Sequence, residues 1–265
     1  MNVSTINKEV WLDYVIQGRS FGFPVLFLHG FTDSRRSYDR IMARIPRSIN
    51  AVAISQRGHG DSDRPEEDYS PSAFASDVAA LMDRLKLQQA LIVGHSMGGT
   101  VAQRFALDYP ERTRGLVLVG SFYSIKNHDG VKEFWDSTVS KLEDPVDAEI
   151  VRSFQMSTIA KPVPPTFMDT IIRESLKLPA RVWKSTLRAL LDTDFTRELG
   201  RIRVPTRLIW GDQDTYASRN DQDRLLAAIP GSRLSVYAGI GHSPQWEDPG
   251  QFVTEITDFA SLLGR

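Results

Sequence analysis

The amino-acid sequence predicts an α/β fold, a doubly wound and mostly parallel sheet of about eight strands flanked by helices. Short, continuous apolar runs recur along the 265 residues, and such runs are typical of strands buried on both faces. Helical patterns lie between the runs, and this alternation favours a doubly wound arrangement. One stretch, from about residue 124 to residue 199, has helical patterns only, which predicts a helical lid inserted after the sixth strand.

The predicted strands begin near the N-terminus. Alternating apolar residues from Val10 to Ile16 predict a half-buried strand, and the segment before it predicts a hairpin that turns near Asn7 and Lys8. The buried strands that follow are expected at Val25–Leu28, Ala51–Ile54, Ala90–Val93, Leu116–Val119, Arg207–Trp210 and Leu234–Tyr237. The hairpin and these runs together make up the sheet of about eight strands.

Three helices beside the sheet have clear signals. Apolar residues recur at helical spacing over Phe74–Leu85 and form one face. A second helix is expected to begin at Met97 and to end before Pro110. Near the C-terminus, Asp248 is a favourable N-cap and Pro249 suits the first position of a third helix.

The stretch without strands is expected to form a cap. Its helical patches, punctuated by prolines, are Val131–Leu142, Ala148–Thr158, Phe167–Leu178 and Arg181–Leu191. The strand pattern resumes at Val204, so the stretch is interpreted as an insertion within one α/β domain. We therefore expect a core domain made of residues 1–123 and 200–265, and a helical cap of residues 124–199.

The composition excludes several classes of protein. The formal net charge is −1 and the basic residues are scattered, so no basic stripe indicates nucleic-acid binding. The absence of cysteine excludes disulfides, thiolate metal sites and cysteine nucleophiles. The N-terminal residues lack the order of a signal peptide, and no apolar run approaches the roughly 20 residues that span a bilayer. We expect a cytoplasmic protein with no nucleic-acid or membrane partner.

A glycine-rich segment holds the clearest chemical signal. It reads GHSMG at residues 94–98, directly after the run Ala90–Val93, and it matches the pattern G-x-S-x-G. A serine hydroxyl is a weak nucleophile, so it needs a base beside it and a sharp turn that exposes it. The flanking glycines permit such a turn. The segment predicts Ser96 as a nucleophile, and a purely structural glycine turn is the alternative that partner residues must exclude.

Five motifs give the sequence a family resemblance over nearly its whole length. They are HGF at 29–31, QRGHGDSDRP at 56–65, GHSMGG at 94–99, WGDQD at 210–214 and GHSPQWEDP at 241–249. With these motifs the chain resembles the α/β-hydrolase fold superfamily, and within it the serine hydrolases of the esterase and lactonase-like kind. The resemblance implies a nucleophile-elbow serine and a catalytic triad in the chain order Ser, Asp or Glu, His. It implies neither a metal nor a cofactor.

The base of the triad is expected at His242. This residue follows the last strand-like run and precedes the C-terminal helix, so a loop can bring its imidazole to Ser96 as general base and later general acid. The remaining histidines are expected to serve packing, structural hydrogen bonds or the surface, and they are His29, His59, His95 and His128.

The acid of the triad is expected in the loop after Arg207–Trp210, where Asp212 and Asp214 both lie. The family pattern G-x-x-D selects Asp214, which would hold His242 in one tautomer and stabilise the imidazolium. Asp212 is expected to cap the turn instead. Some relatives carry the acid after the preceding strand, but that position here reads Gly-Ser-Phe at 120–122.

An oxyanion hole and a substrate pocket are expected beside Ser96. Acyl transfer needs N–H donors aimed at the developing oxyanion. One is expected from the backbone of Met97, and the resemblance implies the backbone of Phe31 as the other. Substrate-binding side chains are expected among Phe31, Phe122, Trp135, Phe154, Trp183 and Trp246, although helix packing explains most of these aromatic residues equally well.

The expected function is hydrolysis of small, largely apolar carboxylic esters or lactones through an acyl-enzyme on Ser96, with a small-molecule substrate as partner. Three alternatives stay open: a carbon–carbon bond hydrolase of aromatic ring-cleavage products, a ligand receptor with slow turnover, and a cofactor-free perhydrolase. The first alternative shares SMGG and QWE, yet it typically has Asn at the position of His95 and Gly at that of Phe31. The serine at 96 disfavours the relatives whose nucleophile is aspartate. The sequence does not predict the oligomeric state.

Overall fold

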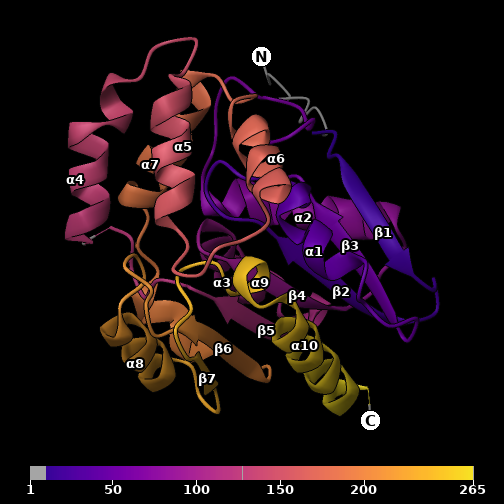
Figure 1. Ribbon diagram of the computed structural model, residues 1–265. Coiled ribbons are helices and arrows are strands. Elements are labelled where there is room, and N and C mark those ends of the chain that lie inside the picture. Colours follow the sequence, from indigo (N-terminus) through magenta and orange to yellow (C-terminus); the bar gives the residue numbers. More distant parts are fainter. Residues whose placement is uncertain (1–9, 127, 265) are drawn as a thin grey trace, which may run out of the picture.

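The computed structural model describes residues 10–126 and 128–264, in which seven strands form one sheet (Figure 1). The strands are β1 (Tyr14–Gly18), β2 (Phe23–Leu28), β3 (Ile49–Ile54), β4 (Ala90–His95), β5 (Thr113–Val119), β6 (Thr206–Gly211) and β7 (Arg233–Tyr237). Their order is β1-β3-β2-β4-β5-β6-β7, and only β1 runs antiparallel to its neighbour. The predicted doubly wound, mostly parallel sheet is confirmed. The described residues hold seven strands in place of about eight, and the hairpin expected near Asn7 and Lys8 lies outside them.

The chain changes direction across the sheet between β2 and β4. Val25 of β2 pairs with Ala51 of β3 on one side and with Leu91 of β4 on the other. From β2 the chain proceeds outward to β3, whereas from β4 it proceeds the opposite way to β5. In open α/β sheets, ligands bind at the carboxyl ends of the strands at such a point. The loop after β2 begins at His29 and the turn after β4 holds Ser96, so both lie at this position.

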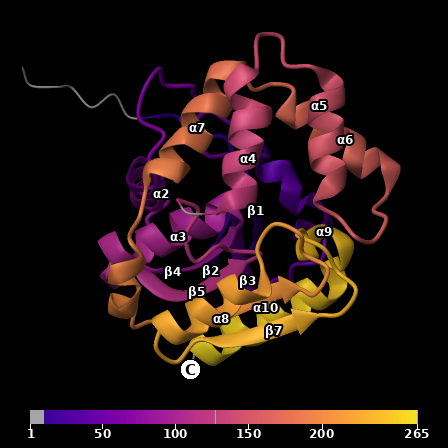
Figure 2. The same cartoon turned by 90° about the vertical axis from the view of Figure 1, so that its left-hand side faces the viewer.

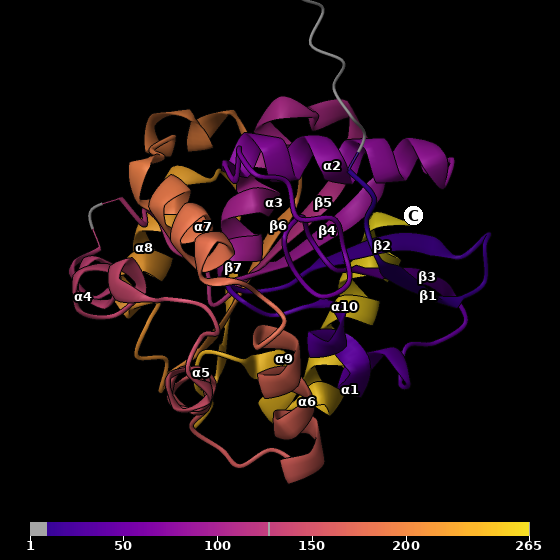
Figure 3. The ribbon, with the colours of Figure 1, turned by 90° about the horizontal axis from the view of Figure 1, so that it is seen from above.

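Helices cover both faces of the sheet (Figure 3). One face carries α2 (Pro71–Arg84), α3 (Met97–Asp108) and α8 (Arg219–Ala228), and the other carries α1 (Asp39–Met42) and α10 (Pro249–Leu263). Asp248 accepts a hydrogen bond from the Gln251 N–H at the start of α10, which confirms the predicted N-cap. Shorter elements are α9 (Pro244–Glu247) and the 3₁₀ segments η1 (Arg35–Tyr38), η2 (Pro110–Arg112), η3 (Val139–Lys141) and η4 (Thr196–Arg201).

Helix α8 has no counterpart among the sequence-based predictions. It buries Asp221, Gln222 and Leu225, two polar residues and one apolar residue. Because it lacks an apolar stripe, its helical period leaves no hydrophobic signal.

Four helices lie between β5 and β6 in the chain, and they group over the end of the sheet where Ser96 lies (Figures 1 and 2). They are α4 (Asp129–Ser137), α5 (Ala148–Ser157), α6 (Pro165–Ser175) and α7 (Ala180–Asp192). The first ends at Ser137 rather than at the expected Leu142, because the chain tightens there into η3. Within the described part of the chain, no helix is long and apolar enough to cross a membrane.

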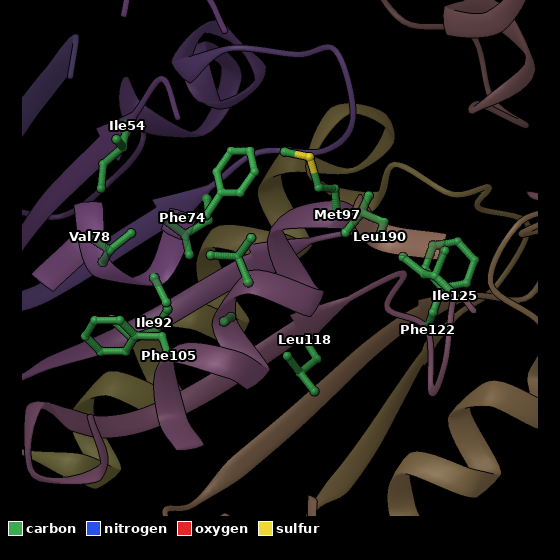
Figure 4. Packing of buried hydrophobic residues seen from close by; sticks show 14 of the residues in the cluster. Ile54, Phe74, Val78, Ile92, Met97, Phe105, Leu118, Phe122, Ile125 and Leu190 are labelled. Atoms are coloured by element: carbon green, nitrogen blue, oxygen red, sulfur yellow. The ribbon is translucent and has the colours of Figure 1, made fainter. Parts of the chain in front are cut away.

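The apolar core on the α2 and α3 face continues into the inserted helices (Figure 4). Phe74 of α2 and Phe105 of α3 belong to this cluster, which extends through Met97 to Phe122 and Leu190. A second cluster on the opposite face joins α1 and α10 to the sheet. The inserted helices therefore share the core of the sheet.

The approach of α3 to β2 depends on a glycine at position 98. A Cβ on Gly98 would lie 2.2 Å from Leu28 O and 2.6 Å from His29 O, both backbone atoms. Gly98→Ala is therefore expected to lower the free energy of unfolding by more than about 3 kcal/mol, since strand and helix must separate. Urea unfolding measures the change. The control is Gly250→Ala in α10, where the nearest atom would be 3.7 Å away, and equal stabilities of the two variants would contradict the expectation.

Candidate active site

Ser96 lies at the sharp turn between β4 and α3. Its φ is 53° and its ψ is −116°, a backbone region that residues other than glycine rarely occupy. The Ser96 N–H donates to Val119 O of β5 at 2.9 Å, and the Gly99 N–H donates to Ser96 O at 2.8 Å, so the turn is held on both sides. A Cβ on Gly94 would lie 2.1 Å from Gly98 O, and a Cβ on Gly98 would lie 2.2 Å from Leu28 O, so the motif requires glycine at both positions. Strain of this kind costs about 1–3 kcal/mol and is concentrated at functional sites.

His242 and Asp214 form a buried hydrogen-bonded pair. His242 Nδ1 lies 2.8 Å from Asp214 Oδ2, and the side chains are 4% and 0% exposed. The other carboxylate oxygen accepts the N–H groups of Tyr216 at 2.8 Å and Ala217 at 3.0 Å. The carboxylate is thus fixed by its own loop, so Nδ1 carries the hydrogen and Nε2 is left as a proton acceptor.

Asp212, the other acid in this loop, has a different environment. Its side chain is exposed, and Oδ1 accepts the Gly239 N–H at 2.7 Å and the Gln213 side-chain amide at 3.1 Å. Asp212 therefore joins the loop after β6 to the loop after β7, and it caps the turn between them.

The backbone of His242 is held by hydrogen bonds from the end of β4 and to the end of α5. His95 Nε2 donates to His242 O at 2.9 Å, and the His242 N–H donates to Thr158 O at 2.9 Å at the end of α5. Burial lowers the pKa of His95 to about 3, so its ring stays neutral. A Cβ on Gly120, whose φ is +49°, would lie 3.0 Å from His242 Nδ1. His95, interpreted from sequence as packing, thus also supports the backbone of the proposed base.

The loop after β2 is fixed by a buried histidine. His29 Nδ1 donates to Gly30 O at 2.8 Å, and its Nε2 accepts the Gln56 N–H at 2.9 Å. Burial lowers the pKa of His29 well below its usual value, so the ring is neutral and keeps this tautomer. Phe31 follows in the loop, and Met97 is the first residue of α3, whose first-turn N–H groups have no acceptor within the helix.

Ser96 and His242 face a common cavity of about 60 Å³ with a largely apolar lining. Of the aromatic residues expected at the substrate, the lining contains Phe31, Phe122, Phe154 and Trp246. Trp183 and Trp135 do not belong to it. Trp183 is buried beside the pocket wall, with its ring edge-on to Phe31 at 5.3 Å, and Trp135 is half-buried with Arg188 over its ring.

The lining also contains residues beyond the predicted site residues. The polar ones are Asp33, His95, Gln155, Thr158 and Tyr216, and the apolar ones include Ile125, Val131, Phe134, Leu187 and Leu190. Asp33 and Tyr216 each lie two residues from a predicted site residue, which is the signal that could have found them. No lysine or arginine is among these described lining residues, and residues 10–126 and 128–264 hold no group of three or more potential metal ligands.

Known proteins are similar to this chain in sequence and in fold. The family model described as alpha/beta hydrolase fold matches residues 24–249. The AB hydrolase superfamily protein YisY of Bacillus subtilis is 25% identical over 267 residues, which cover 97% of this chain and 98% of that protein. A 2-hydroxy-6-oxononadienedioate/2-hydroxy-6-oxononatrienedioate hydrolase of Paraburkholderia phymatum is 26% identical over 250 residues, covering 89% and 86%.

A solved structure extends the comparison. The esterase RhEst1 from Rhodococcus sp. ECU1013 has a TM-score of 0.83 and 27% sequence identity, over 96% of each chain. Its fold therefore matches over nearly the full length of both proteins. Since the family model also matches most of the sequence, the chain belongs to the alpha/beta hydrolase fold family.

Proposed function

We propose that the chain is a serine hydrolase of small, largely apolar carboxylic esters or lactones, with Ser96, His242 and Asp214 as its triad. The observation that carries the proposal is the 2.8 Å contact between His242 Nδ1 and Asp214 Oδ2, on an imidazole that shares a cavity wall with Ser96. The 27% identity to an esterase over 96% of both chains supports an ester substrate. Membership of a hydrolase-fold family supports the broader class.

The proposed reaction has two stages. Ser96 Oγ attacks the carbonyl carbon while His242 Nε2 takes the hydroxyl proton, and the backbone N–H groups of Phe31 and Met97 stabilise the oxyanion. The carbon–oxygen bond to the leaving alcohol then breaks as His242 returns the proton to that alcohol. Water attacks the acyl-enzyme with His242 again as base, which releases the acid and restores Ser96.

The cavity supports a short substrate. Its volume of about 60 Å³ and its aromatic and aliphatic walls suit a small apolar acyl or alcohol group. Part of the wall comes from α4, α5 and α7, so residues 124–199 would act as a cap on the core formed by 1–123 and 200–265. The cap would exclude water from the reacting groups.

A carbon–carbon bond hydrolase is the second candidate, since the Paraburkholderia phymatum relative is named for a dioate substrate. A dianionic substrate needs cationic partners when it is desolvated. The described lining holds no lysine or arginine and does hold the carboxyl group of Asp33. These features favour the neutral ester.

The proposal is tested with 4-nitrophenyl esters of increasing acyl length, small lactones and a fluorophosphonate probe. We expect wild type to prefer short acyl groups and the probe to label Ser96, because an activated serine attacks phosphorus as it attacks an ester. Ser96→Ala should lose both hydrolysis and labelling. Ser153→Ala, on the exposed side of α5, is the matched control and should keep both.

Other outcomes would change the proposal. Full activity in Ser96→Ala would contradict the mechanism. An unlabelled Ser96, together with a ligand that raises the Tm and is turned over slowly, would favour a receptor.

A further inference from the structure

Gln155 is a buried amide of α5 that contacts the loop after β2. Its side chain is 1% exposed. Its Nε2 lies 2.8 Å from Ser175 Oγ, 3.0 Å from Asp33 Oδ1 and 3.1 Å from Thr32 Oγ1. Thr32 and Asp33 directly follow Phe31, the proposed oxyanion donor. One side chain of the inserted segment is therefore bonded to the loop that would bind the oxyanion.

Thr32 has a backbone conformation that its residue type disfavours. Its φ is 65°, and a β-branched residue with positive φ is an outlier. Thr32 is also fully buried, and such conformations persist only where the surroundings hold them in place. The contact with Gln155 is one of the interactions that hold this residue. Loss of this contact would remove one of the restraints on the loop that carries the Phe31 N–H.

The contact between Gln155 and this loop also involves the carboxyl group of Asp33, which can carry a charge. It is 2% exposed, and among the described residues no lysine or arginine forms an ion pair with it. Burial raises the pKa of Asp33 to about 7, while hydrogen bonds from the side chains of Gln155 and Ser37, the charge of His242 and the backbone of Gly30 favour the carboxylate. A buried carboxylate without a cation depends on such donors. Gln155 therefore stabilises the ionised form of a residue in the loop Phe31–Asp33, which is called the oxyanion loop below.

The next turn of the chain holds the loop of the proposed base. Thr158 O accepts the His242 N–H at 2.9 Å. Glu247 Oε2, from the helix after that loop, accepts the N–H groups of Ala160 at 2.8 Å and Lys161 at 2.6 Å. Residues 155–161 thus contact both the oxyanion loop and the histidine loop.

We propose that Gln155 is a positioning residue whose amide fixes the loop Phe31–Asp33 against α5 and so sets where the Phe31 N–H lies relative to Ser96. This inference rests on the proposed hydrolase function. Donors in an oxyanion hole act on the transition state more strongly than on the bound ester. Gln155 should therefore affect kcat much more than KM, and α5 must stay docked during turnover.

Gln155→Ala tests the inference in the full-length protein. Because a displacement of about 1 Å in a catalytic group can cost about 100-fold, kcat is expected to fall about 30- to 100-fold, with KM within about three-fold. The Kd of phenylboronic acid, which forms a tetrahedral adduct with a catalytic serine, should rise by a similar factor. The Kd of butyrate, a product whose carboxylate carbon is planar, should stay unchanged.

The matched control is Met156→Ala, the next residue on α5, which is 47% exposed. It should keep kcat and the boronate Kd of wild type. If the boronate does not bind wild type, the proposed function fails. If it binds wild type and Gln155→Ala equally and their kcat values agree, the positioning role is overturned while the proposed function stands.

Gln155→Glu keeps the shape of the side chain, and its effect is measured as the pH dependence of kcat. A role of Gln155 in packing alone would not change that pH dependence. At pH 8 the introduced carboxylate repels that of Asp33, whereas at pH 5.5 the two can share a proton and restore the contact. Tyr38, His95 and His242 also face Asp33, but both proteins carry them. The ratio of variant to wild-type kcat should rise about ten-fold or more between pH 8 and pH 5.5. A constant ratio would overturn the inference.

Discussion

Asp214→Asn is expected to lower kcat for ester hydrolysis by about 10⁴-fold while leaving the fold intact. Asp214 Oδ2 faces His242 Nδ1 at 2.8 Å, and Oδ1 accepts two backbone N–H groups of its own loop. An asparagine can keep those two bonds with its oxygen, which turns its NH₂ group toward Nδ1. Nδ1 must then accept a hydrogen bond, so the imidazole proton moves to Nε2. A protonated Nε2 cannot take the proton of Ser96.

The matched control is Asp212→Asn, two residues earlier in the same loop. Asp212 is exposed and accepts the Gly239 N–H, a bond that asparagine keeps, so kcat should change less than about three-fold. Steady-state kinetics with a 4-nitrophenyl ester measure both variants, and circular dichroism checks the fold. A reversed pattern, with activity lost in Asp212→Asn and kept in Asp214→Asn, would assign the acid to the other residue.

The second large effect is a loss of stability in weak acid. Burial lowers the pKa of His59 to about 4 and that of His95 to about 3, and it also lowers the pKa of His29. A histidine with a lowered pKa in the folded state contributes stability above its unfolded pKa of about 6.5, and this is lost as pH falls toward the folded pKa. Between pH 6.5 and pH 4, His59 and His95 are each expected to cost about 3 kcal/mol.

Asp33 acts in the opposite direction. Burial raises its pKa to about 7, so its contribution is present at low pH and is lost as pH rises from about 4 to 7. In that window the stability gained from Asp33 offsets the loss from about one of His59 and His95. The loss from His29 adds to the losses from those two histidines. Burial also raises the pKa of Asp39 and of Asp77, and these two groups act in the same direction as Asp33. The net loss on acidification is therefore expected to be about 3 kcal/mol, a large share of the 5–15 kcal/mol that is typical of a domain.

Urea unfolding at pH 7.5, 6.5, 5.5 and 4.5 measures this loss. His59→Asn should make the pH dependence shallower by about one proton, because its amide can still donate to Arg57 O but does not titrate. His128→Asn at the start of α4 leaves the buried histidines in place and should keep the wild-type slope. A stability that is constant from pH 6.5 to pH 4.5 would contradict the expectation.

The sequence predicted most of the sheet because its strands are buried on both faces. β3 and β4 are buried along their whole length, so each is a continuous apolar run that could be recognised without a partner. At the edge of the sheet, alternation predicted a strand over Val10–Ile16, whereas β1 spans Tyr14–Gly18, so only its first three residues were predicted. Two residues of β1 are half-buried and three are exposed, and such a strand has no continuous apolar run. Ser96, Asp214 and His242 were predicted from their motifs and from the family's chain order, and the structure brings the last two into contact.

The contacts of the inserted helices could not be predicted in this way. Helical periodicity assigns Val151 to a buried face, but it cannot show that Gln155 on the same helix faces Asp33, 122 positions earlier in the chain. The same limit applies to Trp183, which fits a pocket by residue type yet packs behind Phe31. Pattern reasoning identifies which residues are buried, whereas the partner of each buried side chain depends on the packing of whole elements.

The shared core has a consequence for recombining this chain with its relatives. Phe122, Ile125 and Leu190 lie at the junction between the sheet and the inserted helices, in one continuous apolar cluster (Figure 4). A chimera that takes residues 124–199 from another family member would place side chains of different size and shape against the sheet at that junction. It would then carry voids or overlaps, each of which costs stability. Exchange of the insertion alone is therefore a repacking problem, and successful chimeras must carry the facing side chains of α3 and of the strand ends with it.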